Sequence, residues 1–346
     1  MVSRHSSFHR LSWVAASSVV RRWMWVPLVA ALAIAAGSGV ARAEKMLYVA
    51  TGFGARVLAY DLSSDDPATI AGSQSTLWNG TTYASSVAVD GSGNVYSGWG
   101  ASGGGQIGRV RKISPSGTLL GEWFSGAENV GAMAASGGAL YYWRNSYNLS
   151  PQVARLNSDG TIQTYAAPPT TDGLGGLAID HTGQIFTSTG SNPYAGNGTV
   201  YKVHPNGTTT LFWDAGYQRA SFFLAFSPIS PDLFVGTYNS DNTVNTWNVN
   251  TGGTANKFIN GTWGSMAFDG TGNLWITGNN SIRKYDPSGN FLYSFSTGTY
   301  SPSSIALSQN AAGVPEIDPA ALGSVLALVG GVLGLVERRR LATDCV

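Results

Sequence analysis

The stretch SSVAVDGSGNVYSG, from Ser85 to Gly98, decides the fold. Two short runs with valine, alanine and tyrosine flank a turn rich in glycine, serine and asparagine, which is typical of a β-hairpin. Similar stretches begin at Gly131, Gly175, Phe223, Gly264 and Ser303. One alanine recurs in all of them, at positions 88, 134, 178, 225, 267 and 306, so the steps are 46, 44, 47, 42 and 39 residues. A period of this length indicates a β-propeller.

Each repeat contains a second hairpin, such as GRVRKIS and TLLGEWF around the turn PSG, so it supplies four strands. We expect the small alanine to lie on the innermost strand, where neighbouring blades crowd the axis. The last repeat has only SSIAL, from Ser303, and strands near Leu47, Arg56 and Ser75 supply the missing three. We therefore predict an all-β, six-bladed propeller closed by N- and C-terminal strands in one blade, which removes exposed sheet edges.

The pattern VAVDGSGNVY, repeated as LAIDHTGQIF and MAFDGTGNLW, resembles NHL-type six-bladed propellers. The resemblance covers about Lys45 to Asn310, and we assign residues 44–310 to this domain. It implies a fold and no particular function, because propellers include both enzymes and binding proteins.

The N-terminus has the order of a secretory signal. Arg21 and Arg22 precede an apolar run, and Ala41-Arg42-Ala43 follows it, so residues 1–43 are expected to be a signal peptide. The arginine pair also resembles a twin-arginine signal. An uncleaved membrane anchor is the alternative.

The C-terminal residues 311–346 resemble a PEP-CTERM sorting signal. The matching features are a short motif, an uncharged run from Ala320 to Val336 and an arginine cluster; the matching residues are Val314, Pro315, Glu316, Arg338, Arg339 and Arg340. Ile317 replaces the usual second proline, and LATDCV extends past the arginines. The resemblance implies a transmembrane helix and two partners, the export machinery and an exosortase-type enzyme. A plain tail anchor is the alternative, and both place the middle of the chain in the cell envelope or outside the cell.

Charge and cysteine content exclude several functions. Between Glu44 and Gly313 there are 12 Lys/Arg and 15 Asp/Glu, so no basic stripe for nucleic acid is expected. The one cysteine, Cys345, allows no disulfide within the chain.

Ligand-binding residues are expected on the face that carries the long connections, between second and third strands and between blades. Aromatic rings pack on sugars and amides hydrogen-bond hydroxyls. The candidates are Trp99, Tyr147, Tyr194, Tyr238 and Asn239. They indicate a glycan-binding surface; the alternative is that they are ordinary loop formers.

Carboxylates on the same face indicate an enzyme as the alternative function. Glu128, Asp172, Asp214 and Asp241 could act as acid and base or hold a cation at the channel mouth. The architecture resembles propeller lactonases and streptogramin-type lyases, whose chemistry uses metal ligands or histidines around the channel. His181 and His204 are expected in turns on the opposite face. NSDNT, from Asn239, is a fragment of a calcium-loop pattern, and otherwise we expect no cofactor or metal.

The sequence thus predicts an exported, surface-associated propeller that acts as a non-catalytic binding or structural protein of the cell envelope or extracellular matrix. Polysaccharide and envelope protein are the candidate ligands. A lactonase-like hydrolase or lyase and a protein–protein scaffold are the alternatives.

Overall fold

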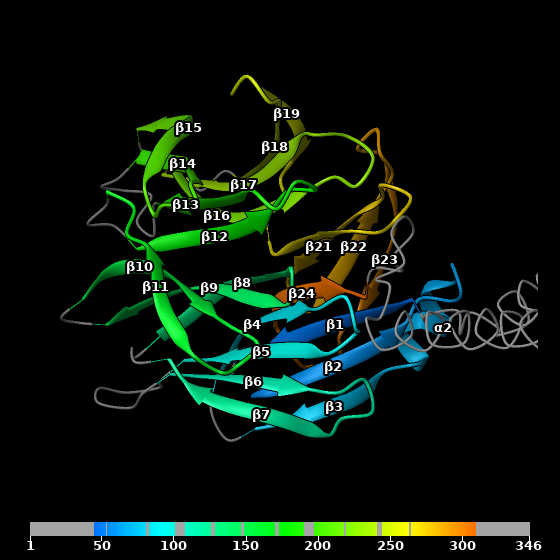
Figure 1. The fold of residues 1–346 in the computed structure, drawn as a ribbon. Helices are drawn as coiled ribbons and strands as arrows, with labels where there is room; N and C mark the ends of the chain where they lie inside the picture. The colour runs from blue at the N-terminus through cyan, green and yellow to red at the C-terminus, as the bar shows by residue number, and fades with distance from the viewer. Residues whose placement is uncertain are drawn as a thin grey trace, which may run out of the picture. The chain divides into compact units, whose positions relative to one another are not determined.

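The computed structural model describes residues 45–52, 54–80, 83–100, 108–125, 129–146, 149–169, 173–189, 197–217, 219–240, 244–262 and 264–308. The chain divides into two units, Met1–Ala43 and Glu44–Val346, and all described residues belong to the second. These residues form six four-stranded antiparallel sheets arranged around a common centre (Figure 1). The predicted six-bladed propeller is confirmed.

Blade 1 is built from both ends of the described chain and has the strand order β24-β1-β2-β3. Leu47 of β1 pairs with Leu307 of β24, and Thr51 pairs with Pro302. In Figure 1 the orange β24 accordingly lies beside the blue β1. The predicted closure is confirmed. The strands are β1 (Met46–Thr51), β2 (Arg56–Asp61), β3 (Ser75–Asn79) and β24 (Pro302–Leu307).

In each of blades 2 to 4 the strands follow in chain order from the centre outward. Blade 2 contains β4 (Ala84–Val89), β5 (Val95–Trp99), β6 (Arg109–Ile113) and β7 (Leu119–Phe124). Blade 3 contains β8 (Asn129–Ser136), β9 (Ala139–Ser146), β10 (Leu149–Leu156) and β11 (Ile162–Ala166). Blade 4 contains β12 (Leu174–Ile179), β13 (Ile185–Thr189), β14 (Asn197–Val203) and β15 (Thr209–Tyr217).

Blades 5 and 6 complete the ring. Blade 5 contains β16 (Arg219–Phe226), β17 (Leu233–Asn239), β18 (Val244–Val249) and β19 (Ala255–Asn260). Blade 6 contains β20 (Met266–Phe268), β21 (Leu274–Gly278), β22 (Ser281–Tyr285) and β23 (Phe291–Ser296). The inner strands touch in the cyclic order β24, β4, β8, β12, β16, β20 and back to β24.

The repeated alanines explain how closely these inner strands approach. All six lie on the innermost strand of a blade, as predicted, at Ala88, Ala134, Ala178, Ala225, Ala267 and Ala306. Larger, buried side chains fill the space between sheets, including Trp275, Tyr60 and Tyr142. Burial of this apolar surface stabilises the ring.

Side-chain hydrogen bonds tie blades 1, 3 and 4 to the inner strand of the next blade. Ser303 Oγ lies 2.9 Å from the carbonyl oxygen of Ala84 in blade 2 and 3.0 Å from that of Ala50. Trp143 in blade 3 donates to the Gly175 carbonyl at 3.1 Å, and Ser188 in blade 4 donates to that of Ser221 at 2.6 Å. Buried main-chain groups that no ladder satisfies thus gain partners.

One short helix, α2 (Pro67–Gly72), interrupts blade 1 between β2 and β3. Asp66 caps it, because its carboxylate accepts from the Thr69 N–H at 2.8 Å, and Pro67 suits the first turn. Ile70 is buried with Trp275 and Phe295 of blade 6. The sequence analysis did not predict this helix.

Candidate functional site

A cavity of about 650 Å³ occupies one end of the axis. Its size falls in the range of small-molecule sites. Every inner strand contributes to its wall. The described residues that line it include Tyr83, Ser86, Asn129, Met133, Trp143, Leu177, Phe222, Ser265 and Ser304.

The cavity lies at the face where the inner strands begin. Tyr83 immediately precedes β4, Asn129 begins β8 and Gly173 precedes β12, and all three line the cavity. Trp99, at the end of β5, pairs with Ala84 at the start of β4. The connections from second to third strands therefore leave from this face, as predicted.

Breaks in the strand ladders build the wall. The register between an inner strand and its neighbour shifts at the same level in blades 1 to 5. The inner-strand residues that these shifts leave out of this ladder are Ser303, Ser85, Gly131, Ala132, Gly175, Gly176 and Phe222. All seven line the cavity. Such bulges redirect side chains and often lie beside functional sites.

The described part of the wall carries no charged side chain. Among the described residues that line the cavity, none is Asp, Glu, Lys, Arg or His. Apolar side chains such as Met133 and Leu177 alternate with hydroxyl groups and glycines. A wall of this kind suits an uncharged ligand with both apolar and polar surface.

Trp143 supplies an aromatic wall whose position is fixed. A Cβ at Gly131 would lie 1.8 Å from Cε2 of Trp143, so the indole ring occupies the space where any other residue would place its side chain. The indole N–H donates to the Gly175 carbonyl across the blade boundary at 3.1 Å. The ring is half-buried and borders the cavity. Gly131 and Gly175 therefore hold Trp143 in place before any ligand arrives.

Three serine hydroxyls on the wall retain hydrogen-bonding capacity. Ser304 Oγ accepts from the Val87 N–H at 3.2 Å, and Ser265 Oγ accepts from the Ile305 N–H at 3.0 Å. Their own hydrogens donate to no described group. Ser86 is 2 % exposed, and its Oγ has no hydrogen-bond partner among the described residues. A buried hydroxyl without a partner is costly, which indicates a place for a polar ligand atom.

The structure places Trp99 at the expected face but inside the protein. Its side chain is 1 % exposed, and the Arg111 guanidinium stacks on its ring at 4.8 Å. Glu122 forms an ion pair with Arg111 and a second one with Arg109, in which the Oε1 and Nη1 atoms lie 2.8 Å apart. These are packing contacts within blade 2, and a ligand-binding role for Trp99 stays a prediction.

The remaining candidates are spread around the ring. Tyr238 and Asn239 end the second strand of blade 5 and are half-buried, whereas Asp214 is exposed on β15, the outermost strand of blade 4. None of the three lines the cavity. The following lie outside the described residues: Tyr147, Tyr194, Glu128, Asp172, Asp241, Val314, Pro315, Glu316, Arg338, Arg339 and Arg340.

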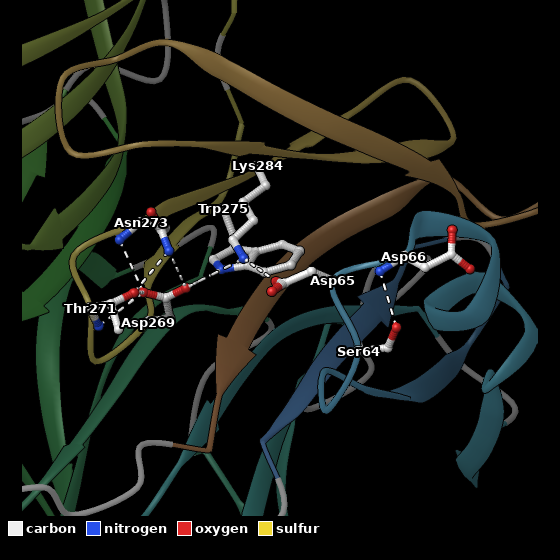
Figure 2. A network of polar contacts seen from close by, with 8 residues as sticks. All are labelled: Ser64, Asp65, Asp66, Asp269, Thr271, Asn273, Trp275 and Lys284. Carbon is white, nitrogen blue, oxygen red and sulfur yellow. Dashed lines mark hydrogen bonds and ion pairs between the residues drawn. The ribbon is translucent and has the colours of Figure 1, made fainter.

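The most buried charged cluster lies on a blade boundary away from the cavity (Figure 2). Lys284 of β22 lies 3.2 Å from Asp65 and 4.0 Å from Asp269, with its Nζ 4.9 Å from the centre of the Trp275 ring. Burial lowers the pKa of Lys284, but the hydrogen bond to Asp65 is among the contacts that outweigh burial and raise it above its ordinary value.

The same arrangement recurs in blade 2, which identifies it as structural. Lys112 lies 3.1 Å from Asp90 and 5.2 Å from the centre of the Tyr96 ring. A feature repeated in the blade framework is a poor candidate for a single catalytic centre. Among the described residues there is also no cluster of three or more His, Cys, Asp or Glu suited to a metal ion.

The sequence analysis missed Trp143, Ser86 and Asn129. The signal that could have found Trp143 is Gly131, the glycine at which its repeat begins, because the indole ring occupies the space that a side chain there would take. Within the described part of the chain, no helix is long and apolar enough to cross a membrane.

Comparison with known proteins supports the fold. No protein-family model matches the sequence, and neither does any curated protein. TolB from Acinetobacter baumannii is similar in structure, with a TM-score of 0.58 and 14% identity over 86% of this chain and 74% of that chain. Virginiamycin B lyase from Staphylococcus aureus is similar too, with a TM-score of 0.52 and 12% identity over 72% of this chain and 80% of that chain.

A gluconolactonase from Xanthomonas campestris is also similar, with a TM-score of 0.52 and 15% identity over 74% of this chain and 86% of that chain. TolB, a lyase and a gluconolactonase thus share one architecture at identities that carry no common activity. The chain is a six-bladed β-propeller of the architecture found in these proteins.

Proposed function

We propose that this chain is an exported, non-catalytic binding protein of the cell envelope or extracellular matrix, and that it holds an uncharged ligand in the central cavity. The observation that carries the proposal is the neutral wall: among the described lining residues, no side chain could serve as a carboxylate or histidine acid or base. The cavity is nevertheless of ligand size and contains hydroxyls that still have capacity to bond.

The proposed cellular location rests on the two ends of the sequence. The signal-like residues 1–43 imply the export machinery, and the PEP-CTERM-like residues 311–346 imply an exosortase-type enzyme and attachment at the C-terminus. We assign the repeats to the NHL type on the pattern VAVDGSGNVY and its copies. Mass measurement of the mature termini tests the proposed location. Loss of both end segments agrees with export and C-terminal processing, and intact ends contradict them.

Retention on isolated matrix material tests the binding proposal. Purified full-length protein is passed over matrix polysaccharide and over envelope protein, together with an Ala132→Phe variant that places a larger side chain at the cavity wall. Ser294→Phe, an exposed position on the outer strand β23, is the matched control. Circular dichroism confirms that each variant is folded.

The proposal expects wild type and Ser294→Phe to be retained and Ala132→Phe to be released. Equal retention of all three would place binding elsewhere and favour a scaffold that uses the outer surface. Turnover of lactones or cyclic esters by wild type, lost in Ala132→Phe, would contradict a non-catalytic role and support the lactonase-like alternative.

A further inference from the structure

We propose that the ligand of the central cavity is a neutral sugar ring that stacks on Trp143 and is hydrogen-bonded by the hydroxyl of Ser86. This inference rests on the proposed function, because it names the ligand class and the specificity-determining residues of the same cavity.

The first step is the shape of the wall around Trp143. Gly131 leaves room for the indole ring, and the bond to the Gly175 carbonyl fixes its rotation. A preorganised aromatic surface binds with little further loss of side-chain entropy. The apolar C–H face of a pyranose ring is the ligand surface that such a ring favours.

The second step is the polar part of the wall. Ser86, Ser265 and Ser304 retain hydroxyl hydrogens that donate to no described group, and Asn129 adds an amide at the rim. These groups both donate and accept, which matches sugar hydroxyls, because a hydroxyl also does both.

The third step is charge. A sugar acid or a phosphorylated sugar needs a cationic partner when it is desolvated, and the described wall has none. A flat aromatic or aliphatic ligand would leave the Ser86 hydroxyl buried without a partner. A neutral sugar is the ligand class that satisfies both the apolar and the polar part of the wall.

Isothermal titration calorimetry of the full-length protein tests the inference. The probes are maltotriose, cellotriose and N,N′,N″-triacetylchitotriose as neutral sugars, and trigalacturonate as a charged one. The variants are Trp143→Ala, Trp143→Phe and Ser86→Ala. Trp123→Phe is the matched control, because Trp123 is a half-buried tryptophan on the outer strand β7 that does not line the cavity.

We expect wild type to bind at least one neutral trisaccharide at least tenfold more tightly than trigalacturonate. Trp143→Ala should weaken that binding at least tenfold, Trp143→Phe less, and Ser86→Ala about three- to tenfold, with Trp123→Phe unchanged. Unchanged affinity in Trp143→Ala overturns the stacking inference.

The experiments distinguish failure of the sugar assignment from failure of the proposed function. If no neutral probe binds while matrix retention still depends on Ala132, the sugar assignment is overturned and the cavity as a binding site stands. If retention also fails to depend on Ala132, the proposed function is overturned as well. Tighter binding of trigalacturonate than of the neutral probes contradicts the charge argument alone and likewise overturns the inference.

Discussion

The Nζ atom of Lys284 in blade 6 lies 3.2 Å from Oδ1 of Asp65, which follows β2 in blade 1 (Figure 2). This ion pair therefore joins blade 6 to blade 1, while the pairing of β24 with β1 closes blade 1 itself. Ile70 of α2 adds a buried apolar contact with Trp275 and Phe295 at the same boundary. The helix that the sequence did not predict thus belongs to the closure of the ring.

Replacing Lys284 with methionine should destabilise the protein by about 2 kcal/mol, because Asp269, which is 20% exposed, loses its cation. Asp65→Asn should cost less than about 1 kcal/mol, since the Asp65 side chain is 91% exposed. Lys112→Met in blade 2 should cost a similar amount, because it takes the cation from Asp90, which is 16% exposed, in the corresponding arrangement within one blade. Urea denaturation measures all three, and a larger loss in Asp65→Asn than in Lys284→Met would contradict this account.

Two buried tyrosines should respond oppositely to the loss of their hydroxyl groups. Tyr60 and Tyr142 are both 0% exposed, but Tyr60 donates to Gln74 Oε1 at 2.8 Å, whereas the Tyr142 hydroxyl has no partner among the described residues. Tyr60→Phe should lower the free energy of unfolding by about 1 kcal/mol, and Tyr142→Phe should leave it unchanged or raise it. Thermal unfolding at pH 7 compares the two; equal losses would show that Tyr142 is satisfied.

Alkaline pH should separate wild type from Tyr142→Phe further. Burial raises the pKa of Tyr142 to about 12, above the value near 10 of an unfolded tyrosine. The stability that the un-ionised Tyr142 contributes to the folded state is therefore complete below pH 10. It is lost as pH rises toward 12, because this tyrosine ionises first in the unfolded chain. Wild type should lose about 1 kcal/mol relative to Tyr142→Phe between pH 9 and pH 11. Urea midpoints across this range give the slopes, and parallel slopes refute the prediction.

Gly131→Ala should displace Trp143 and destabilise the protein by about 1–3 kcal/mol, because the new methyl group would lie 1.8 Å from the ring. Gly270→Ala is the matched control, since nothing lies within 4 Å of a Cβ at that position. Tryptophan fluorescence and thermal unfolding report the two effects. A Gly131→Ala protein as stable as Gly270→Ala would mean that Trp143 has room to move.

The sequence specified the fold because the repeat is regular where packing is tightest. Ala88 and its five counterparts mark the inner strand, and their number gives six blades. The helix α2 was not predicted, because six residues are too few for an apolar periodicity and its role depends on blade 6, far away in sequence.

The cavity wall was harder to predict from the sequence. Which residues face the axis depends on register shifts such as the one between Val130 and Met133, and a shift of one residue exchanges the faces of a strand. Trp99 and Trp143 both sit near the end of a second strand, yet Trp99 is buried against Arg111 whereas Trp143 borders the cavity. Arg111 belongs to the same blade as Trp99, whereas the indole N–H of Trp143 donates to Gly175 of the next blade.

The central claim is that the neutral cavity is where this propeller binds its ligand. Calorimetric titration of the full-length protein with a neutral oligosaccharide released from the matrix, with and without Ala132→Phe, tests it most directly. The account predicts saturable binding of one ligand per chain by wild type and none by Ala132→Phe. Undiminished binding by a folded Ala132→Phe protein would contradict it.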